Sequence, residues 1–195
     1  MKQTKKIIHL AFPAMMENWL QMLMGVVDNY LVAQVGLIAV SGVSVANNII
    51  TIYQAIFIAL GAAVSSLVAK SRGEKNNEKT VQYQSEAIWV TLGLSLVLGL
   101  FSLLFGKTIL HWLGTETIVT QADGLYLAIV GGLIVSLGLM TTLSAFLRAL
   151  GKPQLPMYVS LLSNVLNAIF SAVSVFVFRW GIAGVACSTV LSRFI

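Results

Sequence analysis

Residues 7–35 read IIHLAFPAMMENWLQMLMGVVDNYLVAQV, an apolar run long enough to cross a lipid bilayer as one helix. The run nevertheless carries Pro13, Glu17, Gln21 and Asp28. An ionisable group at the centre of a transmembrane helix costs roughly 2.5–3.5 kcal/mol on insertion scales, so its default interpretation is functional. If the chain moves ions or solutes across a membrane, Asp28 is the first residue to suspect.

The composition of the chain is that of a helical membrane protein. Of its 195 residues, 57% are hydrophobic and only 10% are charged, whereas about a quarter of the residues of a soluble domain are charged. The long runs are apolar on every face, unlike the alternating strands of a transmembrane β-barrel. The sequence therefore predicts an all-α, polytopic transmembrane bundle with the lipid bilayer as a partner.

Charge, cysteine usage and motifs exclude several other classes. The net charge is +5, but the basic residues fall in short loops between apolar runs, so membrane topology explains them and we expect no nucleic-acid partner. Cys187 is the only cysteine, which excludes an intrachain disulfide and a cysteine-cluster metal site. The sequence has no P-loop, HExxH or GxSxG motif. We therefore expect neither an enzyme nor a bound cofactor or resident metal.

Six apolar segments follow one another, each near the roughly 20 residues that a transmembrane helix needs. They are residues 7–35, 43–69, 85–105, 124–147, 155–178 and 182–195. The sixth is too short to cross the bilayer and is still apolar where the chain stops. We therefore expect residues 1–195 to form one six-helix domain, truncated in its sixth helix, of a longer protein. The connection over residues 106–123 predicts a short interfacial helix, with Trp112 at the depth of the headgroups.

The basic residues are divided unequally between the two sides of the predicted bundle. All but Lys107 and Arg179 of the twelve Lys and Arg residues fall on the side of the N-terminus. This side holds Lys2, Lys5, Lys6, Lys70, Arg72, Lys75, Lys79, Arg148, Lys152 and Arg193, the last near the inner end of the sixth segment. Because basic loops stay in the cytoplasm, the division predicts a cytoplasmic N-terminus. We separately expect the plasma membrane of a bacterium as the location.

The first helix carries a polar stripe. The helical period places Glu17, Gln21, Met24 and Asp28 in one narrow sector, which we expect to face the bundle interior or a water-filled cavity. Glu17 and Asp28 lie about 16 Å apart along the axis, so they do not share one ion site. Pro13 predicts a kink one turn before Glu17. Two alternatives stay open: Asp28 as a carboxyl that only holds helices together, and Glu17 as a solvated interfacial acid.

The fifth helix has a second polar face. Asn164, Asn167, Ser171 and Ser174 follow the spacing of one helical side. Such side chains are also common hydrogen-bonding partners between membrane helices. A role in helix packing is therefore about as well supported as a role in a functional site. Since no motif for ATP use is present, energy would come from an ion gradient. A buried carboxyl can serve this purpose by loading and releasing a proton, or by binding Na⁺.

Four segments together resemble a known family of transporters. The first helix resembles the opening helix of the multidrug and toxic compound extrusion (MATE) transporters, in which an aspartate follows a proline by fifteen residues, as Asp28 follows Pro13. The other three segments resemble the end of the family's helix two with its loop, the junction of helices four and five, and the start of helix six. They read LGAAVSSLVAKSRGEKNNEKT, LRALGKPQLPMYVSLLSNVLNAIF and GIAGVACSTVLSRF.

The resemblance implies a twelve-helix antiporter with two six-helix lobes, of which this chain is the N-terminal lobe and lacks its second lobe as partner. The family exports cationic and amphiphilic compounds in exchange for H⁺ or Na⁺, by alternating access between the two sides of the membrane. Carried onto this chain, the cation site consists of Asp28, Asn167, Ser171 and Thr189. Gln21 matches a position that lines the substrate cavity, where we also expect Glu17, Met24 and Asn164.

One departure from the family bears on the coupling ion. Some relatives have a second acid where this chain has Ser171, and a site with one carboxylate supplies less negative charge for Na⁺. H⁺ is therefore favoured over Na⁺, with Asp28 as the coupling carboxylate. Two other functions stay open: a flippase for lipid-linked oligosaccharides in the same superfamily, and a structural or signalling membrane subunit without transport. The flippase is disfavoured because no basic residue is expected at mid-membrane depth to meet a pyrophosphate.

Overall fold

The computed structural model describes residues 2–112 and 117–194, and these form seven α-helices with no strand. The helices are α1 (Lys2–Ala33), α2 (Leu37–Gly73), α3 (Asn77–Trp112), α4 (Thr117–Gly132), α5 (Val135–Ala149), α6 (Gln154–Phe176) and α7 (Gly181–Phe194). The prediction of an all-α polytopic bundle is confirmed. The turn between α5 and α6 forms where Gly151 takes a φ of +77°, a value that side chains disfavour.

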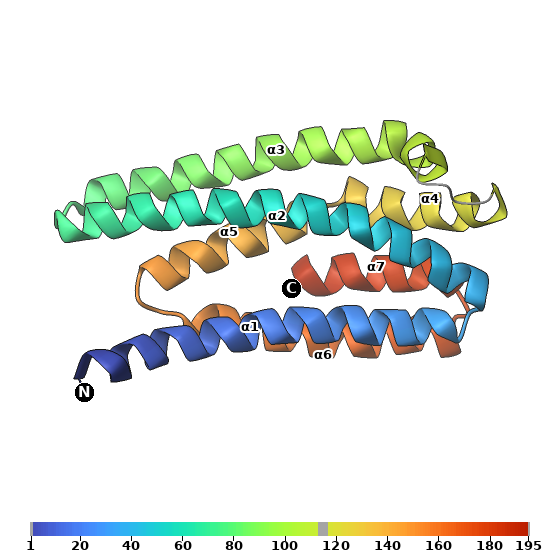
Figure 1. Cartoon of the computed structure of the whole chain (residues 1–195), viewed down its shortest axis with the longest axis horizontal. Helices are drawn as coiled ribbons and strands as arrows, with labels where there is room; N and C mark the ends of the chain where they lie inside the picture. The colour runs from blue at the N-terminus through green and yellow to red at the C-terminus, as the bar shows by residue number, and fades with distance from the viewer. Residues whose placement is uncertain (1, 113–116, 195) are drawn as a thin grey trace.

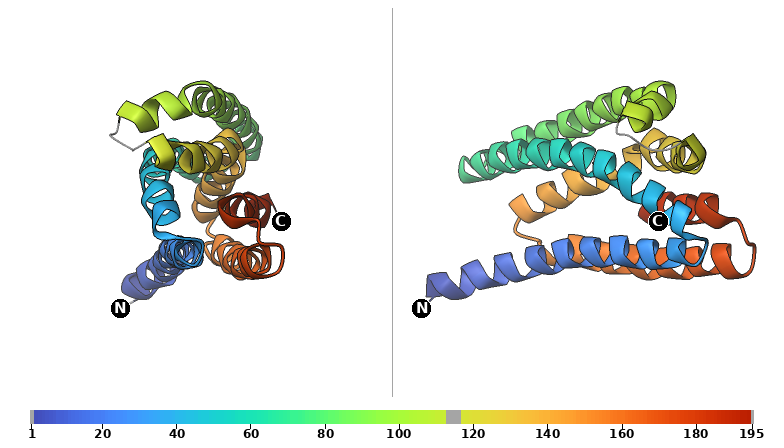
Figure 2. Two further views of the ribbon diagram at one scale, coloured as in Figure 1. Left: turned by 90° about the vertical axis from the view of Figure 1, so that its right-hand side faces the viewer. Right: turned by 45° about the vertical axis from the view of Figure 1, so that its right-hand side comes forward.

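The helices pack as two groups (Figures 1 and 2). In the first group, α6 packs against both α1 and α7. In the second group, α2 packs against α3, α4 and α5. The two groups meet mainly where α4 contacts α7 and where α1 contacts α2.

The chain runs back and forth along one direction, so its turns collect at two ends (Figure 1). One end holds the start of α1, the α2–α3 turn and the α5–α6 turn. We call it the basic end, because its described side chains include Lys70, Arg72, Lys75, Lys79, Arg148 and Lys152. Lys107 and Arg179 lie toward the opposite end. The division of charge expected from the sequence is therefore a division between the two ends of the structure.

Three helices are long and apolar enough to cross a membrane by themselves, over Ala39–Gly73, Asn77–Trp112 and Gln154–Phe176. The predicted span over residues 124–147 is a pair of apolar helices rather than one continuous helix. It is broken into Gly124–Gly132 and Val135–Ala149, which are bent by 44°. α1 is less apolar because of the polar residues in its stripe, and α7 is a shorter apolar helix.

Glycines explain the position of the break. Glycine is a weak helix former, and Gly131 and Gly132 end α4. The carbonyl oxygen of Gly132 also lies against Gly99 of α3, where an added Cβ would be only 2.8 Å away. The two backbones approach closely because both positions lack side chains.

A methyl group at Gly99 should therefore destabilise the protein. We expect Gly99→Ala to lower the free energy of unfolding by about 1–3 kcal/mol, since the new Cβ would displace a backbone carbonyl rather than a flexible side chain. Thermal unfolding in detergent would measure this. Gly93→Ala on the same helix is the control, because nothing lies within 4 Å of its Cβ. Equal unfolding temperatures for the two variants would contradict the expectation.

The connection over residues 106–123 also differs from the prediction. Residues 106–112 belong to α3, and α4 begins at Thr117, so the described part of the connection is not a helix separate from α3, although the last turns of α3 bend away from the rest of the helix (Figure 2). Trp112 is highly exposed at the end of α3, which suits a side chain at the headgroups. The helix continues because this segment contains no proline or other strong breaker before Trp112.

Candidate functional site

Asp28 lies inside the bundle, where α1 packs against α6 and α7, and is only 3% exposed. Thr189 of α7 donates a hydrogen bond from Oγ1 to Asp28 Oδ2, with the two oxygens 2.9 Å apart. Asn167 of α6 donates from Nδ2 to the same Thr189 oxygen at 3.2 Å. Three of the four residues predicted for the cation site are thus joined by hydrogen bonds. The fourth, Ser171, is fully buried beside Asp28.

Several oxygens of this cluster have no hydrogen-bond partner among the described residues. They are Asp28 Oδ1, Asn167 Oδ1 and Ser171 Oγ. A buried polar atom without a partner costs about 1–3 kcal/mol, so such atoms need an explanation. A carboxylate, an amide and a hydroxyl oxygen together form a group that can receive a proton or a small hard cation. Among the described residues, no group of three His, Cys, Asp or Glu side chains could hold a metal ion.

Two further side chains act on this cluster, and the sequence did not single them out. Tyr126 of α4 is 2% exposed and donates a hydrogen bond to Asn47 Oδ1 at 3.3 Å. Arg193 of α7 interacts with Asp28 through its charge but forms no salt bridge with it within 4.0 Å in the described structure. The helical spacing of Thr189 and Arg193 on α7, i and i+4, is the signal that could have identified Arg193.

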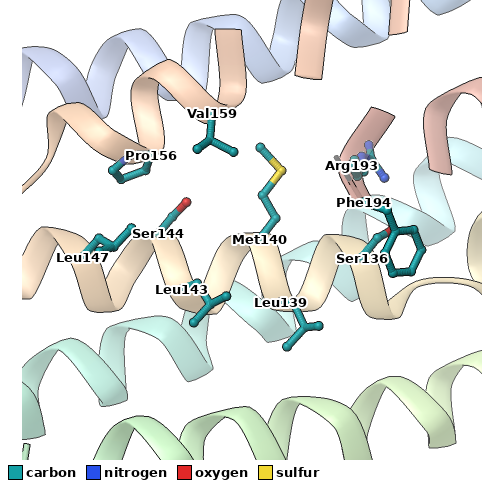
Figure 3. Close-up of a pocket in the computed structure, with 10 residues that line it drawn as sticks. All are labelled: Ser136, Leu139, Met140, Leu143, Ser144, Leu147, Pro156, Val159, Arg193 and Phe194. Atoms are coloured by element: carbon teal, nitrogen blue, oxygen red, sulfur yellow. The ribbon is translucent and has the colours of Figure 1, made fainter. Parts of the chain in front are cut away.

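The position of Arg193 corrects one expectation. From the sequence we expect it near the inner end of the sixth segment, with no base at mid-depth. In the structure α7 starts at the end opposite the basic end and stops partway along the bundle, and Arg193 points into a cavity there (Figures 1 and 3). The reason is that Arg193 follows Gly181, the first residue of α7, by only twelve residues, so it lies about 18 Å along the helix axis from that end.

The cavity lies between α5, α6 and α7 and has a volume of about 310 Å³. Figure 3 places Ser144, Leu147 and Pro156 toward one side of it and Arg193 and Phe194 toward the other. The remaining lining residues are Ser136, Leu139, Met140, Leu143 and Val159. The surface is mostly apolar with a few polar groups, which is typical of a site for amphiphilic molecules.

The side chains predicted to line a substrate cavity do not line this one. Glu17 is 2% exposed and forms an ion pair with Arg148 of α5, so the alternative of a solvated acid is wrong. Gln21 accepts a hydrogen bond from Gln54 of α2 at 2.8 Å. The other two do not reach Asp28: Met24 is buried in the packing, and Asn164 donates to Ser160 O on its own helix.

Pro13 is buried within α1, and the helix continues through it without a break. A helix passing a proline lacks one backbone hydrogen bond at that turn, so a local bend there stays a prediction.

Known proteins with similar sequences are transporters. The chain is 28% identical over 195 residues to the probable multidrug resistance protein NorM of Thermotoga maritima, a match that covers 98% of this chain and 42% of that protein. It is 24% identical over 190 residues to the multidrug export protein MepA of Staphylococcus saprophyticus, covering 97% of this chain and 42% of that protein. The chain thus spans less than half of the length of these relatives.

A solved structure has the same fold at lower identity. It is the outward-facing conformation of a multidrug resistance MATE family transporter of the MOP superfamily. The TM-score is 0.87 at 20% identity, over 97% of this chain and 42% of that one. The family model MatE matches residues 13–173. Because this match covers most of the sequence, the chain belongs to the MatE family, the multidrug and toxic compound extrusion transporters.

Proposed function

We propose that this chain is one lobe of an ion-driven exporter of cationic and amphiphilic compounds, in which Asp28 takes up and releases the coupling ion. The observation that carries the proposal is the buried carboxylate of Asp28, whose Oδ1 has no partner among the described residues and lies in a cluster with two other unpaired oxygens. Family membership supports the transport function, since the matched relatives carry the names of multidrug resistance and export proteins.

H⁺ is the better supported coupling ion. Within the described structure the site has a single carboxylate. A Na⁺ ion needs several oxygen ligands, and one carboxylate supplies less negative charge and fewer such ligands than two would. A proton instead neutralises the carboxylate and needs no further ligands.

Alternating access requires a second moving unit around a central site. The proposal therefore includes a second lobe. The relatives are long enough to contain one, since each is more than twice as long as the segment that matches this chain. We also propose that the basic end faces the cytoplasm, because basic loops are retained on that side.

A gradient experiment separates the two ions. We expect membrane vesicles that carry the complete transporter containing this chain to move a fluorescent organic cation when a pH gradient is imposed. We expect no transport above background with a Na⁺ gradient at equal pH on both sides. Vesicles without the transporter give the background. Equal transport with Na⁺ alone would overturn the choice of H⁺.

A flippase for lipid-linked oligosaccharides is a second candidate, and one observation favours it. Arg193 supplies a base inside the bundle, where none was expected from the sequence. The Asp28 carboxylate offsets that charge, however, so the described interior has no excess of positive charge for a pyrophosphate. The exporter remains the better supported function.

A further inference from the structure

We propose that the ion pair between Glu17 and Arg148 is a latch that joins the two helix groups at the basic end, and that its release opens the cavity beside Ser144 toward that end. Glu17 belongs to α1 of the first group, and Arg148 belongs to the last turn of α5 in the second. The Arg148 guanidinium donates a hydrogen bond to Glu17 Oε2. The two residues are 131 positions apart, so the contact depends on how the groups are placed.

Among the residues whose side chains are described, no buried apolar cluster joins the two groups at the basic end. The larger core cluster does join them, since it contains Val32 of α1 and Val185 of α7 together with residues of α2 and α4. The cluster nearer the basic end is formed by Val64, Val68, Ala87 and Phe146, with Leu60, Tyr83, Ala149 and Leu150 packed against it. All of these residues belong to α2, α3, α5 or the turn that follows α5. The larger cluster and the α5–α6 turn can therefore keep the groups joined while α1 separates from α5 at the basic end.

The described side-chain bridges from α1 to the second group near this end are polar. One is the latch, and the other is the hydrogen bond from Gln54 to Gln21. A hydrogen bond between neutral amides contributes little, because water replaces it easily. Losing one partner of the ion pair costs more, since the Glu17 carboxylate is almost completely withdrawn from water and would be left buried without its partner.

The two partners differ in their contact with solvent, which makes the latch reversible. The Glu17 side chain is 3% exposed and the Arg148 side chain is 33% exposed. A guanidinium at the edge of the bundle can turn into water and return. Arg148 also lies one helical turn after Ser144, which lines the cavity. Release of Arg148 would therefore loosen the wall of the cavity nearest the basic end.

Thiol labelling tests the latch without any transport assay. Cys187 is exposed, so the full chain would carry Cys187→Ala together with Ser144→Cys as the reporter. We expect Glu17→Gln to raise the rate of maleimide labelling at position 144 by about tenfold or more, the change in population that about 1.4 kcal/mol produces. Arg148→Lys keeps the charge but loses the planar donor geometry. It should therefore raise the labelling rate at position 144 less than Glu17→Gln does.

A second reporter separates a latch from a general loss of stability. Ser102→Cys lies in the second group, where the native hydroxyl is buried against Tyr53. We expect its labelling rate to stay unchanged in Glu17→Gln and Arg148→Lys. Glu86→Gln, which removes an exposed acid from α3, should change neither rate. An unchanged rate at position 144, or equal increases at 144 and 102, would overturn the latch.

Discussion

Asp28→Asn should abolish drug resistance in cells that depend on the complete transporter, while the amount of protein in the membrane stays near that of the wild type. Asparagine has nearly the same size as aspartate, and its amide oxygen can still accept the hydrogen bond from Thr189. The helices should therefore pack as before. The substitution removes the charge and the ability to bind a proton, which the proposed coupling requires.

The measurement is the minimum inhibitory concentration of a cationic dye, together with the level of the protein in isolated membranes. Glu78→Gln is the matched control, because Glu78 is an acid in the first turn of α3 with an exposed side chain. We expect this control to retain resistance. Wild-type resistance in Asp28→Asn would refute the role of Asp28. A subunit without transport activity would instead show changed assembly and no transport defect.

The Asp28 cluster was predictable to the extent that it depends on local helical spacing. The period of one helix places Asn167 and Ser171 on the same face of α6, and the structure directs that face toward Asp28. The family resemblance supplied Thr189, which now makes the hydrogen bond to the carboxylate. Tyr126 could not be found in the same way, because its position depends on how α4 packs against α7.

Two features that the sequence did not reveal have a common physical cause, which is that hydrophobicity along the chain does not record tertiary contacts. Residues 124–147 are apolar throughout, so the break after Gly132 gives no signal in hydropathy. Glycine content alone predicts close packing as readily as a break. Arg148 was counted only as a basic loop residue, since its partner Glu17 lies on a helix far away in sequence.

Arg148→Gln should produce a large loss of stability, about 3–5 kcal/mol, because it leaves the Glu17 carboxylate buried without its partner. Glu17→Gln should cost much less. It leaves Arg148 as the unpaired charge, and a side chain that is 33% exposed can turn toward water. The two single variants remove the same ion pair, so unequal losses would come from the difference in burial between the partners.

The double variant Glu17→Gln/Arg148→Gln completes the cycle. With both charges removed, no buried ion remains, so we expect its stability to lie close to that of Glu17→Gln and well above that of Arg148→Gln. Unfolding of the purified chain in detergent would give all four free energies, with Lys152→Gln as a control for a base lost at the same end. Additive losses in the double variant would mean that the two side chains are not coupled. Recovery of stability in the double variant would instead mean that the helix groups stay folded without the latch. A contact that opens and closes requires this.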